Sequence, residues 1–389
     1  MKPKVITIVG AGLAGLSTAI SLSRRVGSKA EVYLFEDHDY IGEELSGDAC
    51  SSVVLDIIRQ RCYVEPHNKW TRSRFNKIMV HFPEGNKLGR ERVDADIEGV
   101  MFDKTKVERD LAKVAKKLGC NIRIGHMFLD GKKTKYGFKT AFREKKTGRI
   151  EHHKTDAIVC ADGYASKVVR SIGLMGKEFW DKIWWPSLDL GLQTRLRGNF
   201  KDIFNEKGIV IKFAENRPSE YFYVFPWNEE EANVGYVSTS RNAKTIDETL
   251  DHYLKLYGYD KYEVLQQKKG KFIPGQGPLF KPYWEGLTVV GDAGAQVEPS
   301  FRAGIRLGVE AGGIAGEVMA EASLANNFSE DKLREYHARL QEVNPSLNHV
   351  KELRETKEII EKVCYRRNIQ KSELTLMNMY FDVIRKYAW

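Results

Sequence analysis

A glycine-rich turn near the amino terminus, GAGLAG (residues 10–15), joins two segments with opposite preferences. The segment KVITIV (residues 4–9) before the turn is apolar and β-branched and predicts a buried strand, and the segment after it predicts a helix. Gly10 permits a tight turn, Gly12 lets the backbone approach a pyrophosphate, and Gly15 lets the helix pack closely on the strand. The turn therefore predicts a Rossmann-like α/β domain that binds a dinucleotide.

An acidic residue follows at the distance that such a domain requires. The next predicted strand, EVYLFE (residues 31–36), ends in Glu36, 21 residues after Gly15. A carboxylate at this position accepts hydrogen bonds from both ribose hydroxyls and repels a 2′-phosphate. The first 36 residues thus leave two dinucleotides open, FAD and NAD.

Two later segments favour FAD, because a flavin must also be held along its ribityl chain. The segment TDAIVCADGYASKVVRSIGL (residues 155–174) contains Asp162-Gly163 directly after a predicted strand. The segment at residues 286–322 has a strand, then Gly291-Asp292, and later Gly304-Ile305 at the start of a long predicted helix. A single Gly-Asp or Asp-Gly pair is a common turn, so the weight lies on the order and separation of the three segments.

Together the three segments resemble the FAD-binding set of hydroxylase-like flavoprotein oxidoreductases. The spacing D-G-x-x-S-x-V-x-R-x-x-G-L from Asp162 to Leu174 is similar to that of the geranylgeranyl reductase family, which includes the archaeal digeranylgeranylglycerophospholipid reductases. The segment PSEYFYVFP (residues 218–226) resembles the PxxYxWxFP segment of the same family, with Tyr223 in place of tryptophan.

The resemblance implies a set of FAD contacts. Asp292 would bind ribityl hydroxyls, Met127 would lie near the adenine, and the helix that starts at Gly304-Ile305 would face the N1/O2 edge of the flavin with its positive end. Lys104 stands where the family usually has an arginine. The implied cofactor-binding residues are Gly10, Gly12, Ala14, Gly15, Glu36, Ser46, Gly47, Ala49, Lys104, Met127, Asp162, Gly163, Asp292, Gly304 and Ile305.

The chain departs from the family pattern in two loops near the expected flavin. Ser46-Gly47 replaces the usual Cys-Gly pair, and Cys50 lies four residues further on. Phe301-Arg302 interrupts what is usually a run of glycines before Gly304. Arg302 at this position is expected to stabilise an anionic reduced flavin or an anionic group of the substrate.

Alternating aromatic residues in YFYVFP (residues 221–226) predict a strand with Tyr221, Tyr223 and Phe225 on one face. NVGYVS (residues 233–238) predicts its hairpin partner. The face is either an ordinary aromatic sheet core or, as the resemblance implies, an apolar slot for a long hydrocarbon chain over the flavin. The expected substrate-binding residues are Tyr221, Tyr223, Phe225, Pro226, Phe301 and Arg302.

These segments divide the chain into a discontinuous FAD-binding domain, a substrate domain with an antiparallel sheet, and a helical carboxyl-terminal region. The expected boundaries are 1–60, 96–175 and 272–325 for the first, 61–95 and 176–271 for the second, and 326–389 for the third.

Composition restricts the class of protein further. The net charge of +9, from 62 basic and 53 acidic residues, suits an acidic electron donor or an anionic membrane surface, but no nucleic-acid motif accompanies it. The five cysteines form no CxxC pair, and the histidines have no metal-ligand spacing, so we expect free thiols and no metal. No apolar run reaches the length of a membrane span, so we expect a cytoplasmic protein, with peripheral membrane contact left open.

The resulting hypothesis is an FAD-dependent reductase that saturates C=C bonds of a geranylgeranyl chain, with Tyr221 or Tyr223 as a candidate proton donor. No second dinucleotide turn is present, so ferredoxin or a transiently bound NAD(P)H is expected to supply electrons. Two alternatives remain open from the sequence: a flavin-dependent monooxygenase or halogenase of the same fold, and a flavin-binding lipid carrier without turnover.

Overall fold

The computed structural model describes residues 2–43, 48–83, 92–214, 220–239, 242–275, 277–279, 281–298 and 301–344. Its first sheet has the order β16-β17-β10-β1-β2-β6, with every neighbouring pair parallel except β16–β17. Parallel strands end at one edge of a sheet, so the turns that follow β1, β2, β10 and β17 meet there. The strands are β1 (Lys4–Val9), β2 (Ala30–Glu36), β6 (Asn121–Ile124), β10 (Ala157–Cys160), β16 (Tyr283–Trp284) and β17 (Leu287–Val289).

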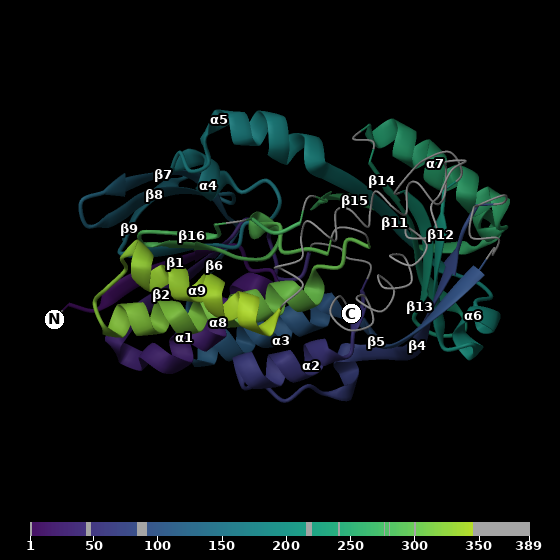
Figure 1. The fold of residues 1–389 in the computed structure, drawn as a ribbon, viewed down its shortest axis with the longest axis horizontal. Helices are drawn as coiled ribbons and strands as arrows, with labels where there is room; N and C mark the ends of the chain where they lie inside the picture. Colours follow the sequence, from purple (N-terminus) through teal and green to yellow (C-terminus); the bar gives the residue numbers. More distant parts are fainter. Residues whose placement is uncertain are drawn as a thin grey trace, which may run out of the picture.

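Helices cover one face of this sheet and a second, three-stranded sheet covers the other (Figure 1). The second sheet, β7-β8-β9, stacks Phe142 on Phe35 of β2, with ring centroids 3.8 Å apart. The helices on the opposite face include α1 (Leu13–Val26), α3 (Lys104–Lys117), α8 (Ile305–Leu324) and α9 (Glu330–Val343), and the strands of the second sheet are β7 (His126–Thr134), β8 (Gly137–Glu144) and β9 (Ile150–Thr155).

Small residues allow α1 and α8 to pack at close range. A Cβ atom at Gly312 would lie 2.1 Å from the carbonyl oxygen of Ala14, and one at Gly316 would lie 2.7 Å from that of Thr18. Ser17 and Ser21 donate hydrogen bonds across the same interface to carbonyl oxygens of α8, at 2.7 and 2.9 Å. The sequence pattern of α1 therefore fixes the position of α8, whose amino terminus lies at the edge where the strands end.

The third sheet has eight strands in the order β15-β11-β14-β13-β12-β4-β5-β3. Its neighbouring strands are antiparallel except for the parallel pair β4–β12. Phe222 and Tyr236 point to the face covered by α7 (Ala243–Leu256), whereas Tyr221 and Tyr223 point to the opposite face. The strands are β3 (Ala49–Ser51), β4 (Thr71–His81), β5 (Arg92–Phe102), β11 (Leu188–Arg197), β12 (Gly208–Phe213), β13 (Tyr221–Pro226), β14 (Glu231–Ser238) and β15 (Glu263–Pro274).

Strand pairing crosses the boundaries expected from the sequence. The short strand β3 pairs with β5, and β5 runs without a break through residue 96, so residues 49–51 and 96–102 belong to the hydrogen bonding of the eight-stranded sheet. Residues 49–51 and 96–102, which were expected in the FAD-binding domain, thus also contribute strands to the sheet of the substrate domain.

Short helices complete the described chain. They are α2 (Val53–Ile57), α4 (Lys167–Ser171), α5 (Gly176–Phe179) and α6 (Lys201–Asn205), with single turns at Gly27–Lys29, Ile58–Cys62, Asn68–Trp70, Trp180–Trp184, Trp185–Ser187, Tyr259–Lys261 and Gly291–Gly294. Within the part of the chain that the structure describes, no helix combines the length and the apolar character needed to cross a membrane.

Candidate active site

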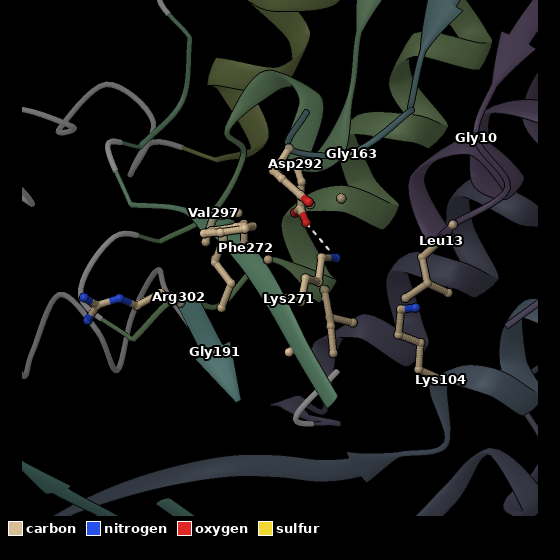
Figure 2. A pocket seen from close by; sticks show the side chains of 18 of the residues that line it. Gly10, Leu13, Lys104, Gly163, Gly191, Lys271, Phe272, Asp292, Val297 and Arg302 are labelled. Carbon is tan, nitrogen blue, oxygen red and sulfur yellow. Dashed lines mark ion pairs between the residues drawn. The ribbon is translucent and has the colours of Figure 1, made fainter. Parts of the chain in front are cut away.

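A cavity of about 1090 Å³ lies between the edge of the parallel sheet and the aromatic face of the eight-stranded sheet (Figure 2). Each of the three sequence segments contributes to its wall. The predicted cofactor-binding residues that line it are Gly10, Gly12, Ala14, Glu36, Ala49, Lys104, Met127, Asp162, Gly163, Asp292, Gly304 and Ile305.

The three glycines of the first turn have three different surroundings. Gly10 has a φ of +100°, and a Cβ atom there would lie 2.2 Å from the carbonyl oxygen of Ala161. Gly15 does not line the cavity; a Cβ atom there would lie 2.0 Å from the carbonyl oxygen of Gly10. Of the atoms that the structure describes, a Cβ atom at Gly12 would meet only Oε1 of Glu108, at 3.8 Å. Gly10 and Gly15 are thus required by packing, whereas Gly12 leaves open space beside the backbone.

Glu36 is anchored at the end of β2 beside this turn. Its Oε2 accepts a hydrogen bond from the Ala11 N–H at 2.6 Å, and its Oε1 accepts from the His38 N–H at 2.9 Å. The residue is 8 % exposed and lines the cavity. A buried carboxylate held in this way presents its remaining lone pairs to hydroxyl groups of a ligand.

The other two acidic residues of the segments differ in role. The carboxylate of Asp162 accepts hydrogen bonds from the Ser166 hydroxyl (2.8 Å) and the Val168 N–H (3.1 Å), so it holds the start of α4. Burial raises its pKa, and these hydrogen bonds oppose the rise. Asp292 instead faces the cavity, where its Oδ2 pairs with Nζ of Lys271 at 2.9 Å (Figure 2).

The structure describes only part of the loop in which Ser46-Gly47 replaces the family's Cys-Gly pair. Ser46 and Gly47 lie outside the described residues. Ala49 lines the cavity, whereas Cys50 is buried, and burial raises the pKa of its thiol. Lys104 lines the cavity at the start of α3, where its Nζ pairs with Glu108 at 2.9 Å.

The aromatic face lines the cavity opposite the glycine turn. Tyr221, Tyr223, Phe225 and Phe301 contribute to it, and the rings of Tyr223 and Phe225 stack with centroids 4.4 Å apart. The Tyr221 hydroxyl donates to the Phe301 carbonyl oxygen, and the Tyr223 hydroxyl donates to Oε1 of Gln193, each at 2.7 Å. Burial raises the pKa of both phenols, so both stay protonated at neutral pH.

Pro226 is not among the lining residues of this cavity. It ends β13 opposite Ala232, and its carbonyl oxygen accepts a hydrogen bond from the Ser73 hydroxyl at 3.0 Å. Pro226 therefore ends strand β13 and takes part in its pairing.

Arg302 lines the cavity but is held by a partner that the sequence did not indicate. Its Nε lies 2.8 Å from Oδ2 of Asp189, and the two side chains are only 1 % and 5 % exposed. Figure 2 shows the guanidinium group directed away from Gly163 and Asp292. The charge of Arg302 is thus paired with that of Asp189 on β11. Its expected role beside an anionic flavin or an anionic group of the substrate stays a prediction.

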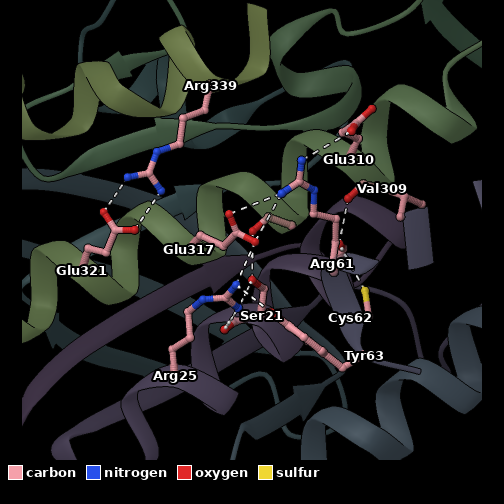
Figure 3. A network of polar contacts seen from close by, with 12 residues as sticks. Ser21, Arg25, Arg61, Cys62, Tyr63, Val309, Glu310, Glu317, Glu321 and Arg339 are labelled. Atoms are coloured by element: carbon pink, nitrogen blue, oxygen red, sulfur yellow. Dashed lines mark hydrogen bonds and ion pairs between the residues drawn. The ribbon is translucent and has the colours of Figure 1, made fainter. Parts of the chain in front are cut away.

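Charged residues anchor α8, the helix that starts at this cavity (Figure 3). Oε1 of Glu317 lies 2.8 Å from Nη2 of Arg25 on α1 and 3.4 Å from Nη1 of Arg61. One turn further along α8, Glu321 pairs with Arg339 of α9 at 2.7 Å. The Glu317 side chain is 14 % exposed and the Glu321 side chain 40 %, so the first site is better shielded from water.

An E317Q variant is expected to lower the free energy of unfolding by about 2 kcal/mol, because two guanidinium groups lose their shared charged acceptor. The matched E321Q variant on the same helix should cost less than E317Q, because water screens the ion pairs of its 40 % exposed side chain. Urea unfolding at neutral pH measures both values. Equal losses in the two variants would contradict the difference in shielding.

Stability should also depend on Glu321 in acid. Hydrogen bonds from Arg339 and Lys332 lower its pKa from 4.5 to about 2, although burial opposes the shift. Between these values the unfolded chain binds more protons than the folded chain, so this contribution is present above pH 4.5 and is lost as the pH falls towards 2. The E321Q variant should show a shallower loss of stability over that range in unfolding measurements than the parent protein.

The unpredicted residues of the site include Gln193 and Lys271, which line the cavity, and Asp189, which pairs with the cavity residue Arg302. Asp189 and Gln193 lie on β11, and Lys271 lies on β15. Side chains alternate along a strand, so the alternation of Asp189, Gly191 and Gln193 was a usable signal for one shared face. No local motif, however, identifies which face meets a ligand.

The comparisons with known proteins agree with this geometry. The FAD binding domain family model matches residues 2–343. Digeranylgeranylglycerophospholipid reductase 1 of Methanosphaera stadtmanae is 25 % identical over 356 residues, covering 91 % of this chain and 84 % of the relative. The digeranylgeranylglycerophospholipid reductase of Methanocaldococcus jannaschii is 27 % identical over 342 residues, covering 87 % of this chain and 82 % of the relative.

Solved structures share the fold. A geranylgeranyl bacteriochlorophyll reductase-like protein from Thermoplasma acidophilum superposes with a TM-score of 0.80 at 19 % identity, covering 99 % of this chain and 92 % of that one. The halogenase PltM (L111Y mutant), solved in complex with FAD, superposes with a TM-score of 0.71 at 13 % identity, covering 98 % of this chain and 79 % of that one.

The described residues fit FAD. Three features lie along one cavity: the open space at Gly12, the anchored carboxylate of Glu36, and the position of Gly163, where a Cβ would have no atom of the described residues within 4 Å. The first turn of α1 also has no side-chain cap, so its N–H groups stay available for phosphate. The chain belongs to the FAD binding domain family and is an FAD-dependent oxidoreductase similar to the digeranylgeranylglycerophospholipid reductases.

Proposed function

We propose that this protein reduces C=C bonds in the geranylgeranyl chains of a polar lipid. The observation that carries the proposal is the row of aromatic side chains that shares one cavity with the FAD-binding turns. A continuous apolar wall suits a hydrocarbon chain, whereas a small polar substrate would leave most of it without complementary contacts. The names of the curated relatives support the same substrate class.

FAD, when bound in the cavity and reduced, would supply a hydride for one carbon of the double bond, and a proton would have to reach the other carbon. The protein's own contribution is to place the chain, to exclude water and to deliver that proton. Tyr221 and Tyr223 are the candidate donors, since both residues line the cavity and both carry a phenol proton.

Tyr223 is the stronger candidate of the two. The Tyr221 hydroxyl donates to a main-chain carbonyl oxygen and so holds the Phe301 loop in place. The Tyr223 hydroxyl donates to the side chain of Gln193, which can rotate about its own bonds. Burial raises the pKa of Tyr223, so the phenol is protonated at neutral pH and can give its proton only to a strongly basic carbon centre.

A Y223F variant is therefore expected to lower kcat by about 100-fold, the lower range for loss of a general acid. FAD affinity should change by less than about twofold, because Tyr223 is assigned to the proton and not to the cofactor. The matched Y221F variant should instead lose about 1 kcal/mol of stability and a smaller part of kcat. Single-turnover reduction and thermal unfolding separate these effects, and a Y223F enzyme with full kcat would remove Tyr223 from the mechanism.

Electrons for the cycle are proposed to come from a separate donor, either ferredoxin or a transiently bound NAD(P)H. The sequence contains one strand–glycine–helix turn of the dinucleotide type, at residues 4–26, and FAD accounts for it. The net charge of +9 suits an acidic donor protein.

The direct test offers a geranylgeranyl lipid to the chemically reduced, FAD-loaded protein without oxygen. Mass spectrometry should then show a gain of two hydrogens for each double bond that is saturated. A parallel reaction with oxygen, halide and an aromatic acceptor tests the halogenase-type alternative suggested by the shared fold. Unchanged lipid together with an oxygenated or halogenated product would reject the reductase proposal.

A further inference from the structure

A second cavity of about 540 Å³ lies beside the first, at the junction of α3 with the eight-stranded sheet. Unlike the first, it is lined mainly by charged groups, and Asp48 belongs to the walls of both. Five basic and three acidic residues line it: Arg72, Lys106, Arg109, Lys113 and Arg195, with Asp48, Asp103 and Asp110.

The positive charge in this cavity exceeds what the neighbouring carboxylates balance. Arg72 pairs with Asp103, and Lys113 pairs with Asp110. Arg195 lies 3.7 Å from Asp48 and donates a hydrogen bond from its Nε to Oδ1 of Asn233. Among the described residues, no acidic side chain pairs with Lys106 or Arg109. The arrangement favours an anion with several acceptor oxygens.

An indole group in the wall adds an unused donor. The guanidinium carbon of Arg195 lies 3.4 Å from the centroid of the Trp227 ring, and that of Arg72 lies 4.9 Å from it. Trp227 is 8 % exposed, and its Nε1 is buried without a hydrogen-bond partner in the described part of the chain. A buried indole N–H normally has a partner, so this donor indicates a ligand.

The second cavity lies at one end of the aromatic row. Tyr221, Tyr223, Phe225 and Trp227 occupy alternate positions and belong to one buried cluster on one face of the sheet. Tyr221 bonds the Phe301 loop of the first cavity, whereas Trp227 lines the second. Six residues of extended strand span about 20 Å, so a lipid chain that follows the row towards the FAD-binding turns has its head at the second cavity.

We propose that this second cavity binds the phosphate of a phosphorylated prenyl lipid, with Arg195, Lys106 and the Trp227 N–H as its principal contacts. The assignment rests on the proposed function for the identity of the chain, and on the charge and donors of the cavity for the phosphate. It makes the cavity a specificity site that orients the lipid relative to the reacting end of the aromatic slot.

The test compares the binding of geranylgeranyl phosphate and geranylgeraniol to the FAD-loaded protein, two ligands that differ only in the phosphate. The parent protein should prefer the phosphate by at least about tenfold. R195Q and K106Q should each reduce this preference by about tenfold and change the affinity for the alcohol by less than twofold. R149Q, an exposed arginine on the β8–β9 ribbon, is the control and should leave both affinities unchanged.

Inorganic phosphate separates a lipid site from a free-anion site. It should compete with geranylgeranyl phosphate but not with geranylgeraniol. Binding of inorganic phosphate that is unaffected by saturating geranylgeranyl phosphate would overturn the lipid assignment.

Three further outcomes would overturn the proposal. The parent protein could bind the two lipids with equal affinity, or R195Q and K106Q could both keep the parent's preference for the phosphate. A folded R195Q or K106Q variant could also lose affinity for both lipids by the same factor. If R195Q does not fold, W227F carries the test, because it removes the N–H and keeps an aromatic ring; it should lower the preference for phosphate several-fold. If the protein reduces the lipid but does not prefer the phosphate, only this site is rejected. If it prefers the phosphate but does not reduce the lipid, only the proposed function is rejected.

Discussion

A G12V variant is expected to fold and to lose at least about 100-fold in FAD affinity, which corresponds to about 2.7 kcal/mol. Gly12 has ordinary backbone angles, φ −69° and ψ 178°, and among the described residues a Cβ atom there has no neighbour closer than 3.8 Å. The valine side chain is therefore accommodated by the apoprotein, but it fills the space where a pyrophosphate must approach the N–H groups of the turn.

The neighbouring glycine supplies the contrast. A G10A variant should destabilise the apoprotein itself, because the added Cβ lies 2.2 Å from a main-chain oxygen and the residue has a φ of +100°. Titration of deflavinated protein with FAD, together with thermal unfolding without FAD, separates the two effects. G12A should be intermediate, and S28V, at an exposed position after α1, should bind FAD normally. Tight FAD binding by folded G12V would contradict the position assigned to the cofactor.

Local sequence was sufficient for the features that depend on local geometry. The turn at residues 10–15, the carboxylate of Glu36 and the alternation of Tyr221 and Tyr223 are each set within a few residues by backbone sterics and strand periodicity. The parallel strand order then brings the predicted turns together at one edge of the sheet. Gly15 has the close packing that was predicted for it, and Pro226 takes part in strand pairing outside the lining of the cavity.

Partners that are far apart in the sequence were not predicted. Asp189 and Arg302 are separated by 113 residues, and Lys271 reaches Asp292 from a different sheet. An ion pair of this kind leaves no periodic signal, since each partner alone reads as an ordinary charged residue. The membership of residues 49–51 in the eight-stranded sheet was missed for the same reason, because three residues carry too little alternation to identify a strand.

Loss of the carboxylate of Asp189 is expected to have the largest effect on stability. A D189N variant leaves the guanidinium group of Arg302, which is 1 % exposed, without its charged partner. Removal of one member of a buried ion pair typically costs about 3–5 kcal/mol. The charge of Glu298 also acts on Arg302, so we expect D189N to lower the free energy of unfolding by about 3 kcal/mol, the lower end of this range. Unfolding by urea measures it, and E285Q, in the exposed Lys133–Glu285 pair, should lose less than about 1 kcal/mol.

The double variant D189L/R302M distinguishes loss of a charge partner from loss of shape. Replacing both members of a buried pair by apolar residues is often neutral for stability, so the double variant should recover most of the stability that D189N loses. The FAD affinity of the double variant should stay below that of the parent protein. Arg302 has a φ of +57° and holds the loop that precedes α8 against β11, and the double variant lacks this ion pair. If the double variant were as unstable as D189N, the loss of stability would come from lost packing of the two side chains and not from an unbalanced buried charge. If D189N kept the full stability of the parent protein, Asp189 would not be the residue that balances Arg302.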